Sequence, residues 1–140
     1  MAITTTGINH LRLTVRDLAA SRHFYDTLFG WDVAIEMPED ADDATREQLS
    51  FLFGGIVYST PGGLFGLRPI ASAEDAFSED RVGLDHLSFA VASRGDLDAA
   101  VELLDSLHAP HAEVKDLGMM YILEFRDPDG IALELAAPKE

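Results

Sequence analysis

The sequence predicts an α+β fold in which two halves of the chain repeat one order of elements: a strand, a helix and about three further strands. The first observation is that a histidine opens an alternating apolar run twice, at His10 and at His86, 76 residues apart. Each run has the period of two that is typical of a strand with one apolar face. The second observation is a helical pattern after each run, and the third is a set of strand-like segments after each helix.

The segment after each histidine run has the spacing of an amphipathic helix. In the first half Asp17 is a suitable N-cap and Gly30 a suitable end, and between them the helical positions are Leu18, Ser21, Tyr25 and Leu28. In the second half the helical positions are Leu97, Val101, Leu104 and Leu107, and Pro110 follows. We expect each helix to cover the apolar face of its strands.

Strand-like segments fill the rest of each half. We expect strands over 31–37, 49–53, 56–60 and 64–68 in the first half, and over 111–117, 119–125 and 131–136 in the second. The stretch from Asp127 to Gly130 is a strong turn signal, so the last two strands should pair as a hairpin around a three-residue loop. That register would place Glu124 directly opposite Glu134.

The length of 140 residues fits one domain, which we divide into a module over 1–68, a linker over 69–82 and a module over 83–140. Neither half could bury its apolar face alone, so the two should share one structure. The absence of cysteine excludes disulfides, thiolate ligands and a cysteine nucleophile, and favours a cytoplasmic protein. No apolar stretch is long enough to cross a bilayer. We also expect no secretory signal, because the first residues lack a charged start and a long apolar segment.

The chain is strongly acidic, with 25 acidic and 10 basic residues and a formal net charge of −15. Such a field repels nucleic acid and anionic membranes and attracts cations. We therefore expect a small-molecule partner, with no nucleic acid and no membrane. The acids concentrate in 38–48 and 70–81, which are either solvated loops or an acidic rim that collects a cationic ligand.

Three polar side chains should share the face of the strands that the helices leave open. Alternation places His10, His86 and Glu134 there, because their apolar neighbours take the helix side. Two histidines and one carboxylate form a facial ligand set for divalent iron, manganese or a similar ion. The alternative is that the three are unrelated polar residues at strand edges.

Further candidates lie on the same face. Two opposed carboxylates, Glu124 and Glu134, do not both ionise cheaply without a nearby cation. Glu124 therefore contacts the metal or its water, or carries a proton as a catalytic acid or base, unless Arg126 or water neutralises it. The expected cavity wall consists of Arg12, Arg68, Ser88, Met120 and Ile122. The two arginines would hold an anionic oxygen of the substrate, or else pair with the abundant acids.

Three segments carry a resemblance to a known family: GINHLRLTVRDLAASRHFYDTLFGW, GLDHLSFAV and FRDPDGIALEL. They resemble the vicinal oxygen chelate superfamily, the glyoxalase, bleomycin-resistance and dioxygenase group, over nearly the whole chain. The resemblance implies paired βαβββ modules, a cup-shaped mixed sheet and usually a homodimer. It also implies a divalent metal (Fe²⁺, Mn²⁺, Zn²⁺ or Ni²⁺) that chelates adjacent substrate oxygens, and it supports His10, His86 and Glu134 as ligands.

This chain differs from individual members of the superfamily at positions that bind metal or substrate, and these differences limit the activities that we expect. Glyoxalase I and methylmalonyl-CoA epimerase have a fourth ligand on the last strand of the first module, where this chain has Gly66, or Leu67 in the other count. Neither residue can ligate through its side chain, which argues against glyoxalase I activity. Extradiol dioxygenases and fosfomycin-resistance transferases tend to carry a tyrosine where this chain has Glu124.

We therefore expect a divalent-metal-dependent enzyme acting on a small substrate with neighbouring oxygens, as a dioxygenase, an isomerase or a lyase or transferase. The alternative is a metal-free acidic protein of the bleomycin-resistance type that sequesters a cationic antibiotic. Whether a site of this kind forms within one chain or between two chains stays open at this level, because both arrangements occur in the superfamily.

Overall fold

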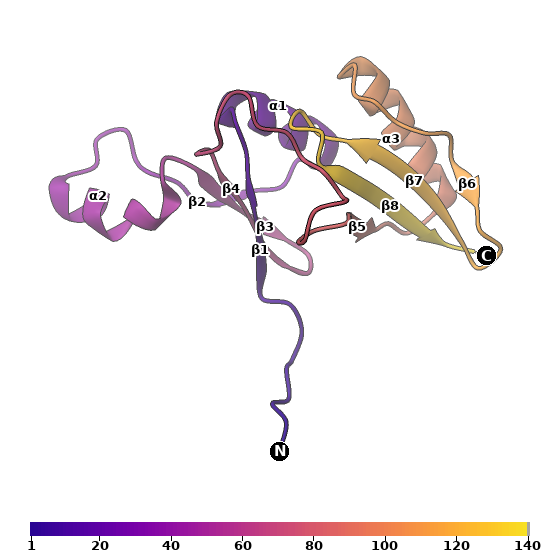
Figure 1. The fold of residues 1–140 in the computed structure, drawn as a ribbon, viewed down its shortest axis with the longest axis horizontal. Helices are drawn as coiled ribbons and strands as arrows, with labels where there is room; N and C mark the ends of the chain where they lie inside the picture. Colours follow the sequence, from indigo (N-terminus) through magenta and orange to yellow (C-terminus); the bar gives the residue numbers. More distant parts are fainter. Residues whose placement is uncertain (140) are drawn as a thin grey trace. The chain divides into compact units, whose positions relative to one another are not determined.

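The computed structural model describes residues 1–139 and contains two four-stranded mixed sheets, which confirms the α+β class and the repeated order of elements (Figure 1). The first sheet has the order β1-β4-β3-β2, with β1 (His10–Thr14), β2 (Val33–Ile35), β3 (Ile56–Thr60) and β4 (Gly63–Arg68). The second has the order β5-β8-β7-β6, with β5 (Leu87–Ala90), β6 (Lys115–Asp116), β7 (Met120–Arg126) and β8 (Ala132–Pro138). Helix α1 (Leu18–Phe29) follows β1, and α3 (Arg94–Ser106) follows β5.

The chain divides into two compact units, and each is described by itself. The first unit combines residues 1–22 and 29–75, and the second combines 23–28 with the chain from 76 onward. The last residue of the second predicted module, Glu140, lies outside the described residues.

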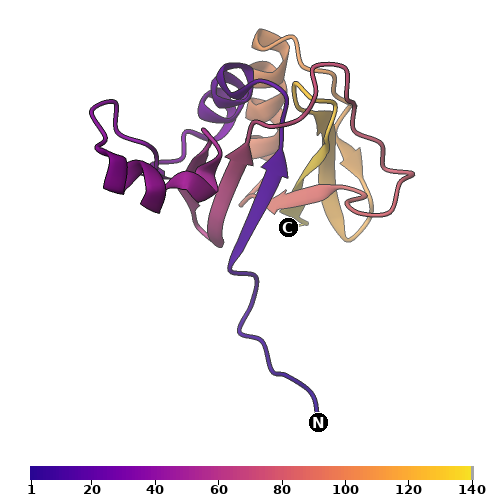
Figure 2. The same cartoon turned by 60° about the vertical axis from the view of Figure 1, so that its left-hand side comes forward.

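In the first unit β1 pairs in parallel with β4, and the two strands lie side by side in Figure 2. The register sets Arg12 opposite Gly66 and Thr14 opposite Arg68. Alternation then places His10 and these four residues on one face of the sheet. The other face is apolar and buried, and it carries Leu13, Phe65 and Leu67. The first face is therefore the one available to a ligand.

In the second unit the hairpin of β7 and β8 has the predicted register, with Glu124 directly opposite Glu134. The amide of Asp127 donates to the carbonyl of Ile131 at 3.2 Å, which closes the three-residue loop. β5 pairs in parallel with β8 and sets Ser88 opposite Glu134. The apolar face of the sheet packs against α3. The buried residues of this layer are Leu97, Ala100 and Leu104 from the helix and Leu123, Phe125, Leu133 and Leu135 from the sheet.

One strand prediction was wrong, and another was confirmed only in part. Residues 49–53 do not form a strand, because the chain there continues from helix α2 (Asp43–Gln48) into the 3-10 helix η1 (Ser50–Leu52). Asp42 caps α2 by accepting the amide of Thr45 at 2.8 Å, so a local hydrogen bond within the acidic stretch starts a helix. The predicted strand over 111–117 is reduced to β6, preceded by a single bridge between His111 and Phe125.

Part of α1 belongs to the second unit. Within that unit the ring of Phe24 lies 6.3 Å from the ring of Phe125, measured between centroids. The hydroxyl of Tyr25 donates to Oδ2 of Asp127 at 2.8 Å, and both residues are buried. The other carboxylate oxygen of Asp127 accepts the amides of Asp129 and Ile131. Burial raises the pKa of Asp127, while these hydrogen bonds act in the opposite direction. The helix and the hairpin turn are thus joined through one carboxylate.

None of the helices among residues 1–139 is both long enough and apolar enough to cross a bilayer.

Removing the Tyr25 hydroxyl tests the bond between α1 and the hairpin. We expect Tyr25→Phe to lower the free energy of unfolding by about 1–2 kcal/mol, because a buried acceptor of Asp127 loses a donor. Urea denaturation measures the loss. Tyr121→Phe, at a less buried tyrosine, is the control and should change stability by less than about 0.5 kcal/mol. Equal stability of Tyr25→Phe and the wild type would show that this bond does not stabilise the unit.

Candidate functional site

The open face of the second sheet carries the larger of the two described cavities, with a volume of about 410 Å³. Three of the predicted site residues line it: His86, Glu124 and Glu134. The remaining lining residues are Glu79, Asp85, Pro110, His111, Ala112, Phe125, Arg126, Ala132 and Leu133. The register of β5, β7 and β8 thus gathers an imidazole and two carboxylates in one unit.

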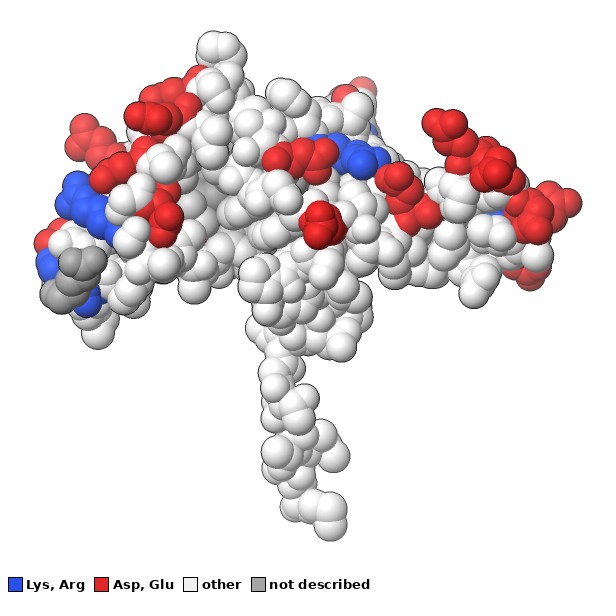
Figure 3. All heavy atoms as spheres, turned by 180° about the vertical axis from the view of Figure 1, so that it is seen from behind, with Lys and Arg blue, Asp and Glu red and all other residues white. Residues whose placement is uncertain are grey.

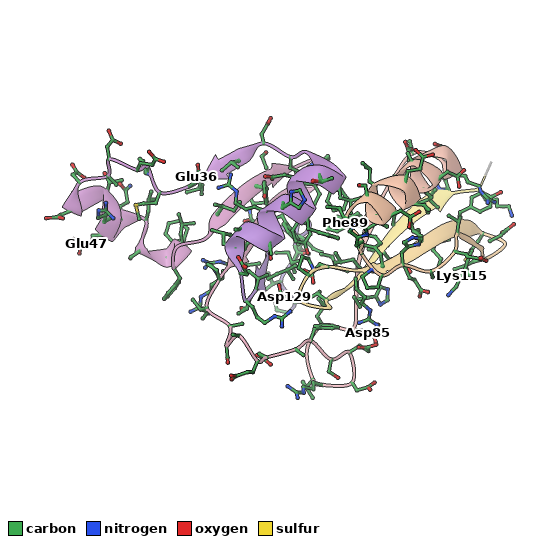
Figure 4. The ribbon with its side chains drawn as sticks, turned by 90° about the horizontal axis from the view of Figure 1, so that it is seen from above. Glu36, Glu47, Asp85, Phe89, Lys115 and Asp129 are labelled. Carbon is green, nitrogen blue, oxygen red and sulfur yellow. The ribbon has the colours of Figure 1, made fainter. Side chains whose placement is uncertain are left out.

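His86 is oriented in this cavity by the residue before it. Nδ1 of His86 lies 2.5 Å from Oδ1 of Asp85, which stands in the loop leading into β5 (Figure 4). This hydrogen bond raises the pKa of His86, as do the negative charges of Glu134, Asp85 and Glu124, whereas desolvation acts against them. The cavity therefore favours a positive charge at this position.

The histidine of the first unit has the same local arrangement. Nδ1 of His10 lies 2.7 Å from Oδ1 of Asn9. If each Nδ1 carries the proton that it donates, both rings present Nε2 as the free nitrogen lone pair. A hydrogen bond that orients a histidine through its second nitrogen is characteristic of histidines that ligate metals. The repeated pair, Asn9 with His10 and Asp85 with His86, is a signal that the sequence contained and that residue spacing alone did not reveal.

Glu134 is also held by a neighbour. The hydroxyl of Ser88, directly across the β5–β8 pair, donates to Oε1 of Glu134 at 2.7 Å. Ser88 was predicted to line the cavity, which stays a prediction, and in the structure it is bound to a predicted ligand. Ser88 binds Oε1 of Glu134 and makes no bond to Oε2, the second oxygen of that carboxylate.

Glu124 has a cationic partner that the sequence analysis did not name. Nζ of Lys115 on β6 lies 2.6 Å from Oε2 of Glu124, and both side chains are about half exposed. Arg126, which was considered as an alternative partner, binds Glu79 through Nη2 and Oε1 at 2.8 Å and lowers the pKa of Glu79 to about 2. Lys115 faces Ile122 across the β6–β7 pair, so a correct β6 register would have placed it beside Glu124.

The other predicted cavity residues fall into two groups. Met120 and Ile122 are on the same face of β7 as Glu124, by alternation, but they are not among the described residues that line the 410 Å³ cavity. Arg12 lines a second cavity, of about 280 Å³, on the open face of the first sheet. The walls of this cavity are Asn9, His10, Leu11, Arg12, Ile35, Phe51, Val57, Leu64 and Gly66.

Gly66 provides the space for Arg12. A Cβ atom built on Gly66 would lie 3.0 Å from Cγ of Arg12, so the aliphatic part of the arginine covers the glycine. Gly66 is one of the two positions at which the family resemblance expects a fourth ligand in glyoxalase I. Here the side chain of Arg12 lies over that position.

The family assignment rests on a match between residues 7–135 and the family model of the Glyoxalase/Bleomycin resistance protein/Dioxygenase superfamily. The chain belongs to this superfamily. It is 31% identical over 130 residues to the Escherichia coli (strain K12) protein named Uncharacterized protein YaeR, an alignment that covers 91% of this chain and 93% of that protein.

Solved structures agree with the assignment. A glyoxylase/bleomycin resistance protein/dioxygenase domain from Frankia sp. EAN1pec is 33% identical, with a TM-score of 0.77, and the match covers 98% of this chain and 95% of that one. A glyoxalase/dioxygenase from Nostoc punctiforme is 25% identical, with a TM-score of 0.73, over 100% and 99% of the two chains. These matches establish the superfamily and leave the reaction open.

The three predicted ligands are distributed over both units. His86 and Glu134 line the cavity of the second unit, and His10 lines the cavity of the first. Within residues 1–139, no group of three or more histidine, aspartate or glutamate side chains is arranged to hold a metal ion. The ligand set of His10, His86 and Glu134 therefore stays a prediction.

The effect of Asp85 on His86 can be measured directly. We expect Asp85→Asn to lower the pKa of His86, because the largest cause of its elevation is the hydrogen bond to that carboxylate. A ¹H NMR titration of the histidine ring protons in chelator-treated protein reports the value. Asp98→Asn, which removes a carboxylate near Arg94 on α3, is the control and should leave His86 unchanged. An unaltered His86 titration in Asp85→Asn would mean that this contact does not form in solution.

Proposed function

We propose that this chain is a divalent-metal-dependent enzyme that acts on a small substrate with adjacent oxygen atoms. The observation that carries the proposal is the repeated orientation of His10 and His86 through Nδ1, by Asn9 and by Asp85. Both contacts would leave Nε2 for a ligand, and in the second unit the favoured charge is positive. Membership of the superfamily makes a metal the expected occupant.

The donor set fits such an ion. His10, His86 and Glu134 would hold it, and two imidazoles with one carboxylate suit Fe²⁺, Mn²⁺, Zn²⁺ or Ni²⁺. Asp85 and Ser88 would orient two of these three ligands, since each already bonds to one of them. A bound ion would act as a Lewis acid that stabilises negative charge on the substrate oxygens.

The protein residues would supply binding and proton transfer. Glu124, directly opposite Glu134, would take a proton from the substrate or return one to it. Its contact with Lys115 would have to open or shift for this, and Lys115 would then lie near the developing charge. A carboxylate at this position, where the resemblance expects tyrosine in dioxygenases and fosfomycin transferases, favours a reaction with proton transfer, such as an isomerisation or an elimination.

Metal content is the primary test. We expect purified protein, reconstituted with Fe²⁺, Mn²⁺, Zn²⁺ or Ni²⁺ and desalted, to retain stoichiometric metal by elemental analysis. His10→Ala, His86→Ala and Glu134→Gln should each weaken binding by about tenfold or more, because each removes a ligand. His23→Ala, at an exposed histidine on α1, is the matched control and should bind as the wild type does. Equal retention of metal by His86→Ala and the wild type would overturn the proposed site.

The role of Glu124 is tested separately. We expect Glu124→Gln to keep its metal but to lose about 100-fold or more of its turnover, since a positioned acid or base contributes this much. The assay is a panel of small substrates with adjacent oxygens, such as hemithioacetals of α-ketoaldehydes, catechols and 2-hydroxy ketones. Full turnover of Glu124→Gln on a substrate that the wild type converts would exclude the residue as a catalytic acid or base.

A second candidate function is sequestration of a cationic antibiotic without metal. It is favoured by the net charge of −15 and by the predominance of acidic over basic side chains on the face shown in Figure 3. Its test is calorimetric titration of chelator-treated protein with bleomycin. Tight, salt-sensitive binding by a protein that retains no metal would replace the enzyme proposal with this one.

A further inference from the structure

We propose that Arg12 and Arg68 form a binding site for the oxyanion of a small organic acid on the open face of the first sheet. The proposal deepens the proposed function by giving the substrate a negatively charged group, and it rests on that function only for calling the ligand a substrate. Binding itself can be measured without metal.

The sheet register brings the two arginines together. Arg12 on β1 lies opposite Gly66 on β4. Arg68 is two residues after Gly66 on β4, so it lies on the same face of the sheet as Arg12, opposite Thr14. The absence of a side chain at Gly66 lets the stem of Arg12 lie across the strand toward β4. Desolvation lowers the pKa of Arg12, and so does the neighbouring charge of Arg68. Two like charges are thus held close to each other.

No carboxylate neutralises this pair. Among residues 1–139, neither Arg12 nor Arg68 has an Asp or Glu oxygen within ion-pair distance, although the chain has 25 acidic residues. By contrast, three other arginines have carboxylate partners: Arg22 with Glu36, Arg94 with Asp98 and Arg126 with Glu79. In so acidic a chain, an unpaired couple of arginines is unexpected unless an anion from outside completes it.

The hydrogen bonds of the pair are also incomplete. Nε of Arg12 and Nε of Arg68 are buried and have no hydrogen-bond partner. Arg12 donates one bond, from Nη2 to the carbonyl of Phe51 at 2.6 Å, and the guanidinium of Arg68 donates none within the part of the chain that the structure describes. Guanidinium groups bind carboxylate and phosphoryl oxygens through paired N–H donors. Since the Nε atoms are enclosed, such an oxyanion would use the terminal nitrogens of Arg68 and Nη1 of Arg12, which have no described partner.

The aromatic ring of Phe53 makes cation–π contacts with both guanidinium groups. Its ring centre lies 4.1 Å from Cζ of Arg68 and 6.0 Å from Cζ of Arg12. Phe53 ends η1 with a φ of 50°, in the left-handed region that a non-glycine residue rarely adopts. Strain of this kind persists where the surrounding structure requires it and clusters at ligand-binding sites. A ring over the face of a guanidinium leaves its N–H edge free for an anion.

The neighbouring cavity indicates the rest of the ligand. Its volume is about 280 Å³, and Arg12 is the one arginine among its described lining residues, which include no lysine, aspartate or glutamate. Its apolar walls are Leu11, Ile35, Phe51, Val57 and Leu64. A molecule with an apolar or aromatic body would fit these walls, and its oxyanion would meet Arg12, with Arg68 beside it. Carboxylate and phosphonate share the required chemistry, whereas inorganic phosphate lacks the apolar body.

The experiment is a calorimetric or NMR titration in the presence of a chelator. The probes are phenylacetate, phenylphosphonate, inorganic phosphate and the neutral phenylacetamide. We expect one of the two aromatic anions to bind at least about tenfold tighter than phenylacetamide, because a bidentate charged hydrogen bond is lost in the amide. A preference between phenylacetate and phenylphosphonate identifies the type of oxyanion. Equal binding of acid and amide, or binding of inorganic phosphate alone, would overturn the proposal.

Variants make the test specific. Arg68→Gln removes a charge without breaking any described side-chain hydrogen bond, although it loses the cation–π contact with Phe53. We expect it to remain folded, as circular dichroism would show, and to bind the anion about tenfold more weakly or worse. Arg68→Lys restores the charge but not the planar donor edge, and should recover only part of the affinity. Arg46→Gln on α2 removes the same charge from the same unit and is the control.

Wild-type affinity in Arg68→Gln would refute the role of Arg68. The chelator also separates this proposal from the previous one, because anion binding is measured without metal. A protein that binds no metal but binds the aromatic anion would lose the proposed enzyme function and keep this site.

Discussion

The parallel pairing of the first strand with the last strand of each unit is the constraint on which the candidate sites depend. In the first unit it sets Arg12 opposite Gly66, and in the second it sets Ser88 opposite Glu134. A slip of one residue would turn every polar side chain of that strand toward the helix side. The buried leucines and phenylalanines prevent such a slip, because each would then face solvent. The apolar core therefore determines where the polar groups stand.

The repeat of the elements extends to the environment of the histidines. Each histidine begins its strand with a side-chain oxygen of the preceding residue bound to Nδ1, from Asn9 in one case and from Asp85 in the other. The two are not equivalent, because Asp85 brings a charge and an amide does not. Around His86 the charges of Glu134 and Glu124 add to that of Asp85 in raising its pKa. The same backbone arrangement thus places one histidine in a cavity that Arg12 also lines and the other among carboxylates.

Much of the fold could be predicted from the sequence because its signals are local and periodic. The hairpin register followed from the Asp127 to Gly130 turn and the alternation of β8, and the helix limits followed from Asp17 and Gly30. The strand prediction over 49–53 was wrong because alternating apolar residues also suit a short 3-10 helix. The helix cap at Asp42 lies before this segment, so the apolar pattern of 49–53 did not include it. Lys115 was missed as the partner of Glu124 because β6 is only two residues long and gives almost no periodicity. The distribution of the predicted ligands over two units is a tertiary property that no local pattern encodes.

The two cavities favour charges of opposite sign, and this difference bears on how so acidic a chain could bind an anion. Exposed charges farther apart than about 8–10 Å are largely screened at physiological salt, so the total of −15 matters less than the nearest groups. At the open face of the first sheet the nearest described groups are two guanidiniums without a carboxylate, shielded in part from water. At the open face of the second they are carboxylates around His86. A ligand with an anionic end would be drawn to the first and a metal cation to the second, since each meets a local field opposite to its own charge. The high net negative charge would then reject polyanions while leaving a small acid, with its single charge, able to reach the arginines.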